Sequence, residues 1–261
     1  MSAAREAIRF DNVAKSFAEY TAVEGITLSI RAGAFLSVVG PSGCGKSTLL
    51  NMAAGLSTPS RGAVSIFGEP LSGINRKAGY MFQQDALLPW KTVEENIRLG
   101  PELRGIPQSQ AIAEAQLWIE RVGLKGFAHR YPHQLSGGMR KRVAMAQTWI
   151  NDPEIIFMDE PFGALDVHTR LRMESEILKL WAETKKTVMF VTHDLEEAIA
   201  LSDEVVVLSA GPASRIVGTY SVNLKRPRNL IDIKTEAAFN EIYGLVWRDL
   251  RGEVLRSYER A

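Results

Sequence analysis

The chain has 261 residues, 46% of them hydrophobic and 23% charged, which is typical of a globular protein able to bury a sizeable core. Its 31 Lys and Arg residues against 30 Asp and Glu residues give a net charge of +1, so the composition does not indicate a nucleic-acid partner and none is expected. One cysteine, Cys44, excludes a disulfide within the chain, and without a signal-like N-terminus or about 18 successive apolar residues we expect a cytoplasmic protein that spans no membrane.

Strands and helices are predicted to alternate along the chain. Residues 8–30 and 62–67 read as amphipathic strands with turn signals at Gly62 and Gly68, and they are expected to form an antiparallel sheet. Four short, almost wholly apolar runs read as buried strands: residues 35–39, 155–158, 187–191 and 204–208. Buried strands separated by helical patterns predict a parallel sheet that is covered on both faces, and therefore the α/β class.

A helical insert and a helical tail interrupt this alternation. Residues 89–150 are expected to be almost entirely helical, beginning with a capping-box spacing between Thr92 and Glu95. One predicted helical face of the insert carries Ile112, Ala115, Ile119 and Val122. The tail after Gly218 contains Pro227 and then a face made of Phe239, Ile242 and Val246, which we expect to pack on the core.

A glycine-rich loop follows the strand at residues 35–39 and precedes a predicted helix. It reads Gly40-Pro41-Ser42-Gly43-Cys44-Gly45-Lys46-Ser47 and matches the pattern G-x-x-x-x-G-K-[ST] in the strand and helix context that the motif requires. Backbone N–H groups of such a loop cup phosphates; Lys46 would reach the β- and γ-phosphates, Ser47 would bind Mg²⁺ and Thr48 would contact the α-phosphate side. The loop predicts a nucleoside triphosphate site, which kinases and GTPases also share.

Cys44 lies inside this loop. We interpret it as a small residue that fills space, although a thiol near a helix N-terminus can have a lowered pKa. We predict that a bulky thiol reagent inactivates the protein and that ATP protects it.

Two carboxylates end the apolar run at residues 155–158. Asp159 and Glu160 would emerge at the carboxyl edge of the sheet, where α/β proteins bind ligands. Together with the phosphate loop, they are predicted to hold Mg²⁺ through Asp159 and to activate the attacking water through Glu160.

A second Gly-Ser motif, Leu135-Ser136-Gly137-Gly138, precedes a predicted helix in the insert. Alone it is explained equally well as a helix cap or as an anion site. In this order, however, the chain resembles the nucleotide-binding subunits of ABC transporters over nearly its whole length. The resemblance implies a P-loop NTPase with a RecA-like parallel sheet, an N-terminal antiparallel β subdomain and an inserted helical subdomain.

The resemblance also implies roles for further residues. Ser136, Gly137 and Gly138 would bind the γ-phosphate of ATP held by a second copy, in a head-to-tail dimer with two ATP molecules between the subunits. Phe17, or less favourably Tyr20, would stack on adenine. Gln83 would contact Mg²⁺ and the water, and His193 would contact the γ-phosphate. Residues 164–166, ending in Asp166, would lie at the dimer interface, and Gln147 departs from the arginine that is common in the family.

The residues at 82–90 and at 138–142 are similar to those of importers of the nitrate, sulfonate and taurine group, which also includes importers of pyrimidine-type precursors. Two further features favour an importer. The chain has a single cassette, and the bulky segment Leu87-Leu88-Pro89-Trp90 follows Gln83, where it is either an exposed partner site or buried in the insert. The implied partners are multi-span permease subunits and, indirectly, an external solute-binding protein, at the cytoplasmic face of the cell membrane. The alternatives are an ABC ATPase for lipid or solute export and a non-transport ABC ATPase acting on ribosomes or DNA.

The resulting division of the chain has three parts. Residues 1–88 and 151–220 are expected to form the ATP-binding core with the antiparallel β subdomain, residues 89–150 the helical signature subdomain, and residues 221–261 a C-terminal helical extension.

Overall fold

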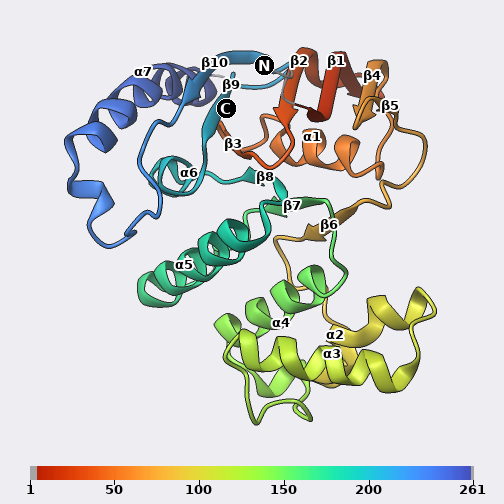
Figure 1. The fold of residues 1–261 in the computed structure, drawn as a ribbon. Helices are drawn as coiled ribbons and strands as arrows, with labels where there is room; N and C mark the ends of the chain where they lie inside the picture. The colour runs from red at the N-terminus through yellow and green to blue at the C-terminus, as the bar shows by residue number, and fades with distance from the viewer. Residues whose placement is uncertain (1–4, 260–261) are drawn as a thin grey trace.

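Two β-sheets organise the protein, and the computed structural model describes residues 5–259 (Figure 1). In spatial order the strands of the larger sheet are β10 (Ile216–Ser221), β9 (Glu204–Leu208), β3 (Phe35–Val39), β8 (Thr187–Val191), β7 (Ile155–Asp159) and β6 (Ala78–Met81). The strands from β9 to β6 pair in parallel, and β10 joins the edge antiparallel to β9. The predicted parallel sheet and its four buried strands are confirmed.

The smaller sheet is antiparallel, as the sequence predicted. Its strands, in spatial order, are β2 (Tyr20–Arg31), β1 (Glu6–Phe17), β4 (Arg61–Ile66) and β5 (Glu69–Pro70). Ala18, with φ of 50°, lies in the left-handed region of the tight turn that divides residues 8–30 into the hairpin of β1 and β2. The sheet packs its apolar face on α1 (Lys46–Ala53), which in turn covers one face of the larger sheet.

Strand β3 shows how one buried strand serves two hydrophobic cores. Its side chains alternate between the faces of the sheet, as side chains of every strand do. Phe35 and Val39 join the core under α5 (Val167–Thr184), α6 (Leu195–Leu201) and the helical insert. Leu36 and Val38 join the core under α1 and the smaller sheet. All four are fully buried, which explains why the strand is apolar at successive positions.

The insert consists of helices joined by loops, and Figure 1 places it at one end of the molecule, beyond β6. Its elements are α2 (Val93–Leu103), α3 (Gln108–Arg121), a short 3₁₀ turn (Pro132–Gln134) and α4 (Gly137–Trp149), which packs against β6. Residues 122–131 are not helical, so the segment is less helical than expected. The predicted capping box is present, because the Thr92 hydroxyl accepts from the Glu95 N–H and the Glu95 carboxylate accepts from the Thr92 N–H. The predicted apolar face needs one correction: Ala111 is buried with Ala115, whereas Ile112 is only half-buried.

The C-terminal segment continues as a 3₁₀ turn (Ile233–Thr235) and α7 (Ala237–Glu259). Phe239 and Val246 are buried in the larger core and Ile242 packs against it, so the predicted packing of the tail is confirmed. Within residues 5–259, no helix combines the length and the apolar character that crossing a bilayer would require.

Two arginines attach the segment before α7 to the core. Arg228 Nη1 donates to the carbonyl oxygens of Ile199, Ala200 and Ser202, at 3.2, 2.9 and 2.7 Å, and so caps the C-terminal end of α6. Burial lowers the pKa of Arg228 to about 10. Arg226 forms an ion pair with Asp203 at 2.8 Å.

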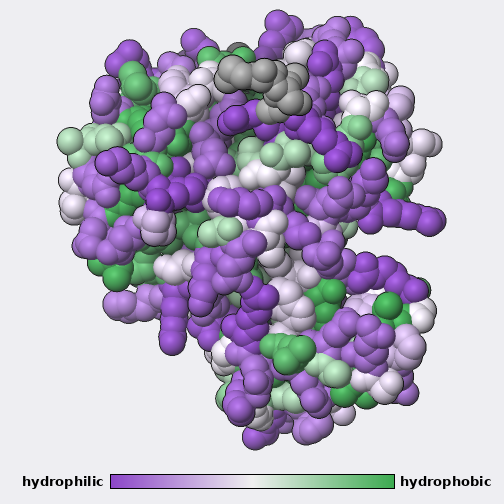
Figure 2. All heavy atoms as spheres, in the orientation of Figure 1, coloured by the Kyte–Doolittle hydropathy of each residue, from purple (hydrophilic) through white to green (hydrophobic). Residues whose placement is uncertain are grey.

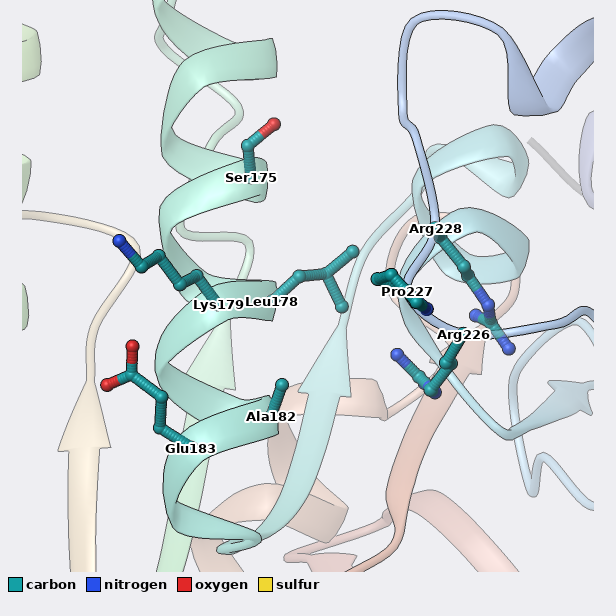
Figure 3. Close-up of a pocket in the computed structure, with 8 residues that line it drawn as sticks. All are labelled: Ser175, Leu178, Lys179, Ala182, Glu183, Arg226, Pro227 and Arg228. Carbon is teal, nitrogen blue, oxygen red and sulfur yellow. The ribbon is translucent and has the colours of Figure 1, made fainter.

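Beside these arginines lies a pocket of about 400 Å³ (Figure 3). In Figure 3 the side chain of Leu178, on α5, points across the pocket toward Pro227. Residues 226–228 and α5 therefore face each other across this pocket.

Candidate nucleotide site

The phosphate loop lies between β3 and α1, in the context that the motif requires. Gly43 and Gly45 have φ values of 75° and 88°, in the left-handed region that side chains disfavour. A Cβ on Gly45 would also lie 2.5 Å from Cγ1 of Val23, so the smaller sheet presses directly on the loop. Lys46 Nζ donates to the carbonyl oxygens of Gly40 at 2.9 Å and Pro41 at 3.1 Å. The lysine thus lies folded along the loop whose amides would hold the phosphates.

Cys44 does not have the environment of a reactive thiol. It is fully buried, with its Sγ against the position that a Cβ on Gly40 would occupy. Burial raises the pKa of the thiol, and the nearby Lys46 charge opposes this only in part. The hypothesis of a lowered pKa is therefore wrong: desolvation outweighs the helix N-terminus, and Cys44 is a small residue that fills space.

The two carboxylates at the end of β7 face the loop as predicted. The Ser47 hydroxyl donates to Asp159 Oδ1 at 2.9 Å, which places two oxygen atoms of the kind that Mg²⁺ prefers side by side. Burial raises the pKa of Asp159, while the Ser47 hydrogen bond opposes the shift and the Glu160 charge adds to it. A cation bound between these oxygens would favour the charged carboxylate, so the donor set fits Mg²⁺.

Glu160 lies beside two other predicted site residues, His193 and Gln83. Its Oε2 is 3.1 Å from Nδ1 of His193 and 3.5 Å from Nε2 of Gln83. Its backbone φ of 42° is left-handed, while its N–H donates to the Val191 carbonyl at 2.9 Å. Non-glycine residues in this region cost of the order of 1 kcal/mol or more and concentrate at functional sites, so the turn that aims this carboxylate away from β7 is a constrained one.

A cavity of about 390 Å³ joins these parts. Its lining residues are Phe17, Tyr20, Ala22, Ser42, Gly43, Cys44, Gly45, Lys46, Ser47, Thr48, Gln83 and Glu160. Phe17 and Tyr20 are about half exposed, and the Tyr20 hydroxyl donates to the Gly43 carbonyl at 3.4 Å. The cavity therefore has an aromatic end and a phosphate-binding end, at a size that suits a small ligand.

The predicted signature residues lie elsewhere. Ser136 caps α4, where its hydroxyl accepts from the Met139 N–H at 3.3 Å, and neither it nor Gly137 nor Gly138 lines the cavity. A Cβ on Gly138 would lie 2.5 Å from Cγ2 of Thr169, so α4 approaches α5 closely at this point. The structure thus separates Ser136, Gly137 and Gly138 from the phosphate loop of their own chain.

Lys141 was missed by the sequence reasoning. It projects from α4 and donates to the Gln83 carbonyl at 2.7 Å, and it pairs with Asp85 at 3.1 Å. Arg140 pairs with the same carboxylate, also at 3.1 Å. Helix α4 therefore contacts both the Gln83 carbonyl and the Asp85 side chain two residues later. The basic run at residues 140–142 was the available signal.

Tyr80 was missed as well. Its hydroxyl donates to Asn51 Oδ1 at 3.1 Å and lies 3.5 Å from Asp159 Oδ2, and its ring stacks on Phe82 at 4.2 Å. Burial raises the pKa of this hydroxyl, so it remains a donor. Phe82 follows the end of β6 and lies two residues after Tyr80, the spacing that places side chains of extended chain on one face, so the sequence did contain this signal.

A groove of about 770 Å³ lies between the helical insert and the sheets. Its apolar lining residues include Ile74, Phe82 and Leu103, and Gln147 lies on its α4 side. Its charged lining residues are Arg76, Lys77, Arg104, Asp152 and Glu154. In Figure 2 the surface is hollowed between the helical part and the rest of the molecule. In the segment at residues 87–90, Trp90 is 71% exposed, whereas Leu87 packs against the core. One end of the segment is therefore exposed, as a partner site requires, and the other end is packed against the core.

The protein is a P-loop NTPase. It has a parallel sheet, a glycine-rich phosphate loop after β3 and an Asp-Glu pair at the end of β7. A family model described as "ABC transporter" matches residues 23–163. Among curated relatives, an uncharacterized ABC transporter ATP-binding protein of Methanocaldococcus jannaschii is 46% identical over 96% of this chain and 93% of its own. The taurine import ATP-binding protein of Yersinia pestis is 43% identical over 81% and 84%, and the aliphatic sulfonates import ATP-binding protein of Bacillus cereus is 40% identical over 97% and 96%.

Solved structures agree with this relationship. The dimeric structure of a bacterial ABC transporter cassette superposes with a TM-score of 0.75 at 31% identity, covering 84% of this chain and 100% of its own. The same cassette in a post-hydrolysis state bound to ADP and Pi gives a TM-score of 0.74. The chain belongs to the ABC transporter family. It is an ATP-binding cassette with ATPase activity, and the predicted fold class is confirmed.

Proposed function

We propose that this ATPase powers a bacterial importer for a small solute, with its cavity as the ATP site. Phe17 would stack on adenine, and residues 40–48 would bind the phosphates. Lys46, released from the two carbonyl oxygens of its own loop, would reach the β- and γ-phosphates. The observation that carries the proposal is the cavity itself, which joins an aromatic end to the phosphate loop and to Glu160.

Glu160 would act as the general base for the attacking water. Its carboxylate lies within hydrogen-bond distance of His193 and at 3.5 Å from Gln83, so both side chains can orient the base and contact the water or the γ-phosphate. The left-handed turn at Glu160 supports this role, because it aims the carboxylate at the cavity.

We propose that Mg²⁺ would be held by Ser47 and Asp159, with Gln83 nearby. When bound, the ion would neutralise charge on the phosphates. The Ser47 hydroxyl and the Asp159 carboxylate lie 2.9 Å apart, so the two side chains are already arranged toward one point. Tyr80, at 3.5 Å from the second Asp159 oxygen, would help to keep the first oxygen directed at Ser47.

The working form would be a head-to-tail dimer of identical chains. Ser136, Gly137 and Gly138 lie outside the cavity of their own chain, and at the start of α4 they present a helix N-terminus that suits a γ-phosphate held by the other copy. The dimeric cassette that superposes on this chain supports the arrangement.

The partner in the membrane would be a multi-span permease, docked in the groove between the helical insert and the sheets. The groove exposes both apolar and charged side chains and is lined by residues from both parts. Lys141, on α4, donates to the Gln83 carbonyl and so links this helix to Gln83. We propose the same division of the chain as above: a core (residues 1–88 and 151–220), a helical subdomain (89–150) and an extension (221–261). The cassette would lie on the cytoplasmic face of the membrane.

The relatives named for taurine and aliphatic sulfonate import favour a small anionic solute of the nitrate, sulfonate and taurine type, or a pyrimidine precursor. In this proposal the cavity of this chain holds ATP and does not contact the solute. An external solute-binding protein would therefore select the solute.

The base is tested with Glu160→Gln. Glutamine keeps the size of the side chain and removes its basicity, so ATP turnover is expected to fall by at least about 100-fold while ATP binding persists. The ATP-bound dimer is expected to accumulate in size-exclusion chromatography. Glu241→Gln, an exposed position on α7, is the matched control and is expected to hydrolyse ATP at the wild-type rate. Normal turnover by Glu160→Gln would overturn the assignment.

Docking is tested with a pair of exposed leucines in the helical insert. Leu103 is 80% exposed and lines the groove, whereas Leu117 is 69% exposed on α3 and lies outside it. Leu103→Glu is expected to abolish co-purification of membrane-spanning subunits from the native host, and Leu117→Glu is expected to retain it. Equal recovery of these subunits with both variants, each melting like the wild type, would contradict the docking site.

A further inference from the structure

A group of charged side chains joins the two loops that flank the candidate active site. It consists of Arg170 on α5 and of Asp194 and Glu197 at the start of α6, and we call it the α5–α6 ion cluster. Arg170 Nη1 lies 3.5 Å from Asp194 Oδ2 and 3.6 Å from Glu197 Oε1. Its Nη2 donates to the Leu165 carbonyl at 3.2 Å. One guanidinium therefore spans from residues 164–166 to the loop that follows β8.

The cluster fixes the backbone on both sides of His193. The Thr192 hydroxyl donates to Glu197 Oε2 at 2.7 Å and accepts from the Asp194 N–H at 3.0 Å. Asp194 Oδ1 accepts from the N–H groups of Glu196 at 2.8 Å and Glu197 at 3.2 Å, and so begins α6. Thr192 and Asp194, the neighbours of His193 in the chain, are thus fixed by hydrogen bonds. The His193 side chain itself is 60% exposed and contacts Glu160.

The cluster is largely withdrawn from water. The side chain of Glu197 is 8% exposed, and those of Arg170 and Asp194 are each 30% exposed. Burying ions costs desolvation free energy that their attraction offsets only when the geometry is good, so such a cluster is weak evidence for stability alone. Its contacts instead converge on two catalytic loops, which points to a role in geometry.

We propose that Arg170 is a positioning residue for ATP hydrolysis, which holds residues 164–166 and His193 in one fixed arrangement through Asp194 and Glu197. This inference rests on the proposed roles of His193 and Glu160. A small displacement of a catalytic group can reduce turnover about 100-fold, so an arrangement maintained by one side chain is expected to matter for kcat. ATP binding, which uses the cavity on the other side of Glu160, is expected to change little.

The chemistry of the contacts requires arginine. Three acceptors, Asp194, Glu197 and the Leu165 carbonyl, lie around the planar guanidinium, whose two terminal nitrogens point in different directions. A lysine ammonium is a single point and would reach only some of them. Arg170→Lys is therefore expected to keep the charge balance and lose the link between the two loops.

The test separates positioning from stability in the full-length protein. Arg170→Met removes the cation and leaves Glu197 charged and buried, so it is expected to lower both the melting temperature and kcat. The double variant Arg170→Met with Glu197→Gln removes both charges, so it is expected to regain most of the melting temperature without regaining kcat. Glu176→Gln is the control. Glu176 is also on α5, but its ion pair, at 3.3 Å, is with Arg142 on α4 and does not involve the residues around His193.

The expected kinetic result is a fall in kcat of roughly tenfold or more for Arg170→Met, Arg170→Lys and the double variant, with KM for ATP within about twofold of the wild type. The imidazole NMR signal of His193, one of four histidines and identified by its loss in His193→Ala, is expected to shift in these variants and not in Glu176→Gln.

A wild-type kcat in Arg170→Met, or recovery of both kcat and melting temperature in the double variant, would overturn the positioning role. Failure of the underlying proposal looks different: His193→Ala and Glu160→Gln would then retain wild-type turnover, whatever the Arg170 variants do.

Discussion

The fully buried side chain of Asn96 fixes the segment that leads from Gln83 into the helical insert. Its Oδ1 accepts from the Leu88 N–H at 2.8 Å. Its Nδ2 donates to the carbonyl oxygens of Leu88 at 3.2 Å, Lys91 at 3.0 Å and Thr92 at 2.9 Å. One amide on the first turn of α2 thus replaces the regular secondary structure that residues 88–92 lack.

The perturbation is Asn96→Ala. The Leu88 N–H then loses its acceptor, and a donor left unsatisfied in a half-buried position costs about 1–3 kcal/mol. The Thr92 carbonyl keeps the Asn96 backbone N–H as a partner, so the three carbonyls together add a smaller loss. We expect the free energy of unfolding to fall by about 2–4 kcal/mol, against about 1 kcal/mol for loss of the neighbouring cap in Thr92→Ala.

The assay is urea unfolding followed by circular dichroism, with limited proteolysis of residues 86–91 as a local readout. Asn96→Asp sharpens the test, because aspartate retains the acceptor for Leu88 and places a buried carboxylate against three carbonyl oxygens. It is expected to be less stable than Asn96→Ala at neutral pH. If Asn96→Ala cost no more than Thr92→Ala, or Asn96→Asp proved the more stable of the two, the reasoning would be refuted.

Three other predictions concern separate parts of the molecule. Because burial raises the pKa of Cys44, a bulky thiol reagent is expected to label it at least about tenfold more slowly in the folded than in the urea-unfolded protein, and equal rates would contradict its burial. Gly138→Ala places a Cβ 2.5 Å from Cγ2 of Thr169 and is expected to cost about 1–3 kcal/mol by thermal unfolding, whereas Gly137→Ala, with its nearest neighbour at 3.8 Å, is expected not to destabilise; equal melting temperatures would refute the clash. Burial and then the Glu197 charge raise the pKa of Glu174 from 4.5 to about 7, so the folded state binds an extra proton between these pH values and this carboxyl destabilises the fold as pH rises through them. Glu174→Gln is therefore expected to be more stable than the wild type at pH 8 and to lose that advantage as pH falls toward 4.5, and a constant difference in urea midpoints across this range would argue against the shift.

The fold followed from local sequence patterns to a large extent. Strands such as β3 and β8 are short and buried on both faces, so their composition is almost wholly apolar and their limits are easy to place. The phosphate loop and the Asp159–Glu160 pair were predictable for a related reason: each is contiguous in sequence and follows such a strand.

Contacts between distant segments could not be predicted in the same way. Lys141 bonds to a carbonyl 58 residues away, and the amino-acid sequence around Lys141 is equally compatible with an exposed lysine. The state of Cys44 required knowledge of its surroundings, because a helix N-terminus and burial shift a thiol pKa in opposite directions and only the packing decides between them.

Two arginines of the C-terminal extension determine where this chain can be truncated without destabilising α6. Arg228 donates to the last carbonyls of α6, the helix that begins two residues after His193. Arg226 pairs with Asp203, the residue before β9. Removing residues after 220 would strip that cap from a helix of only seven residues. We therefore expect loss of residues 221–261 to destabilise α6, and a domain swap that joins a different C-terminal module to this cassette should place the junction beyond α7.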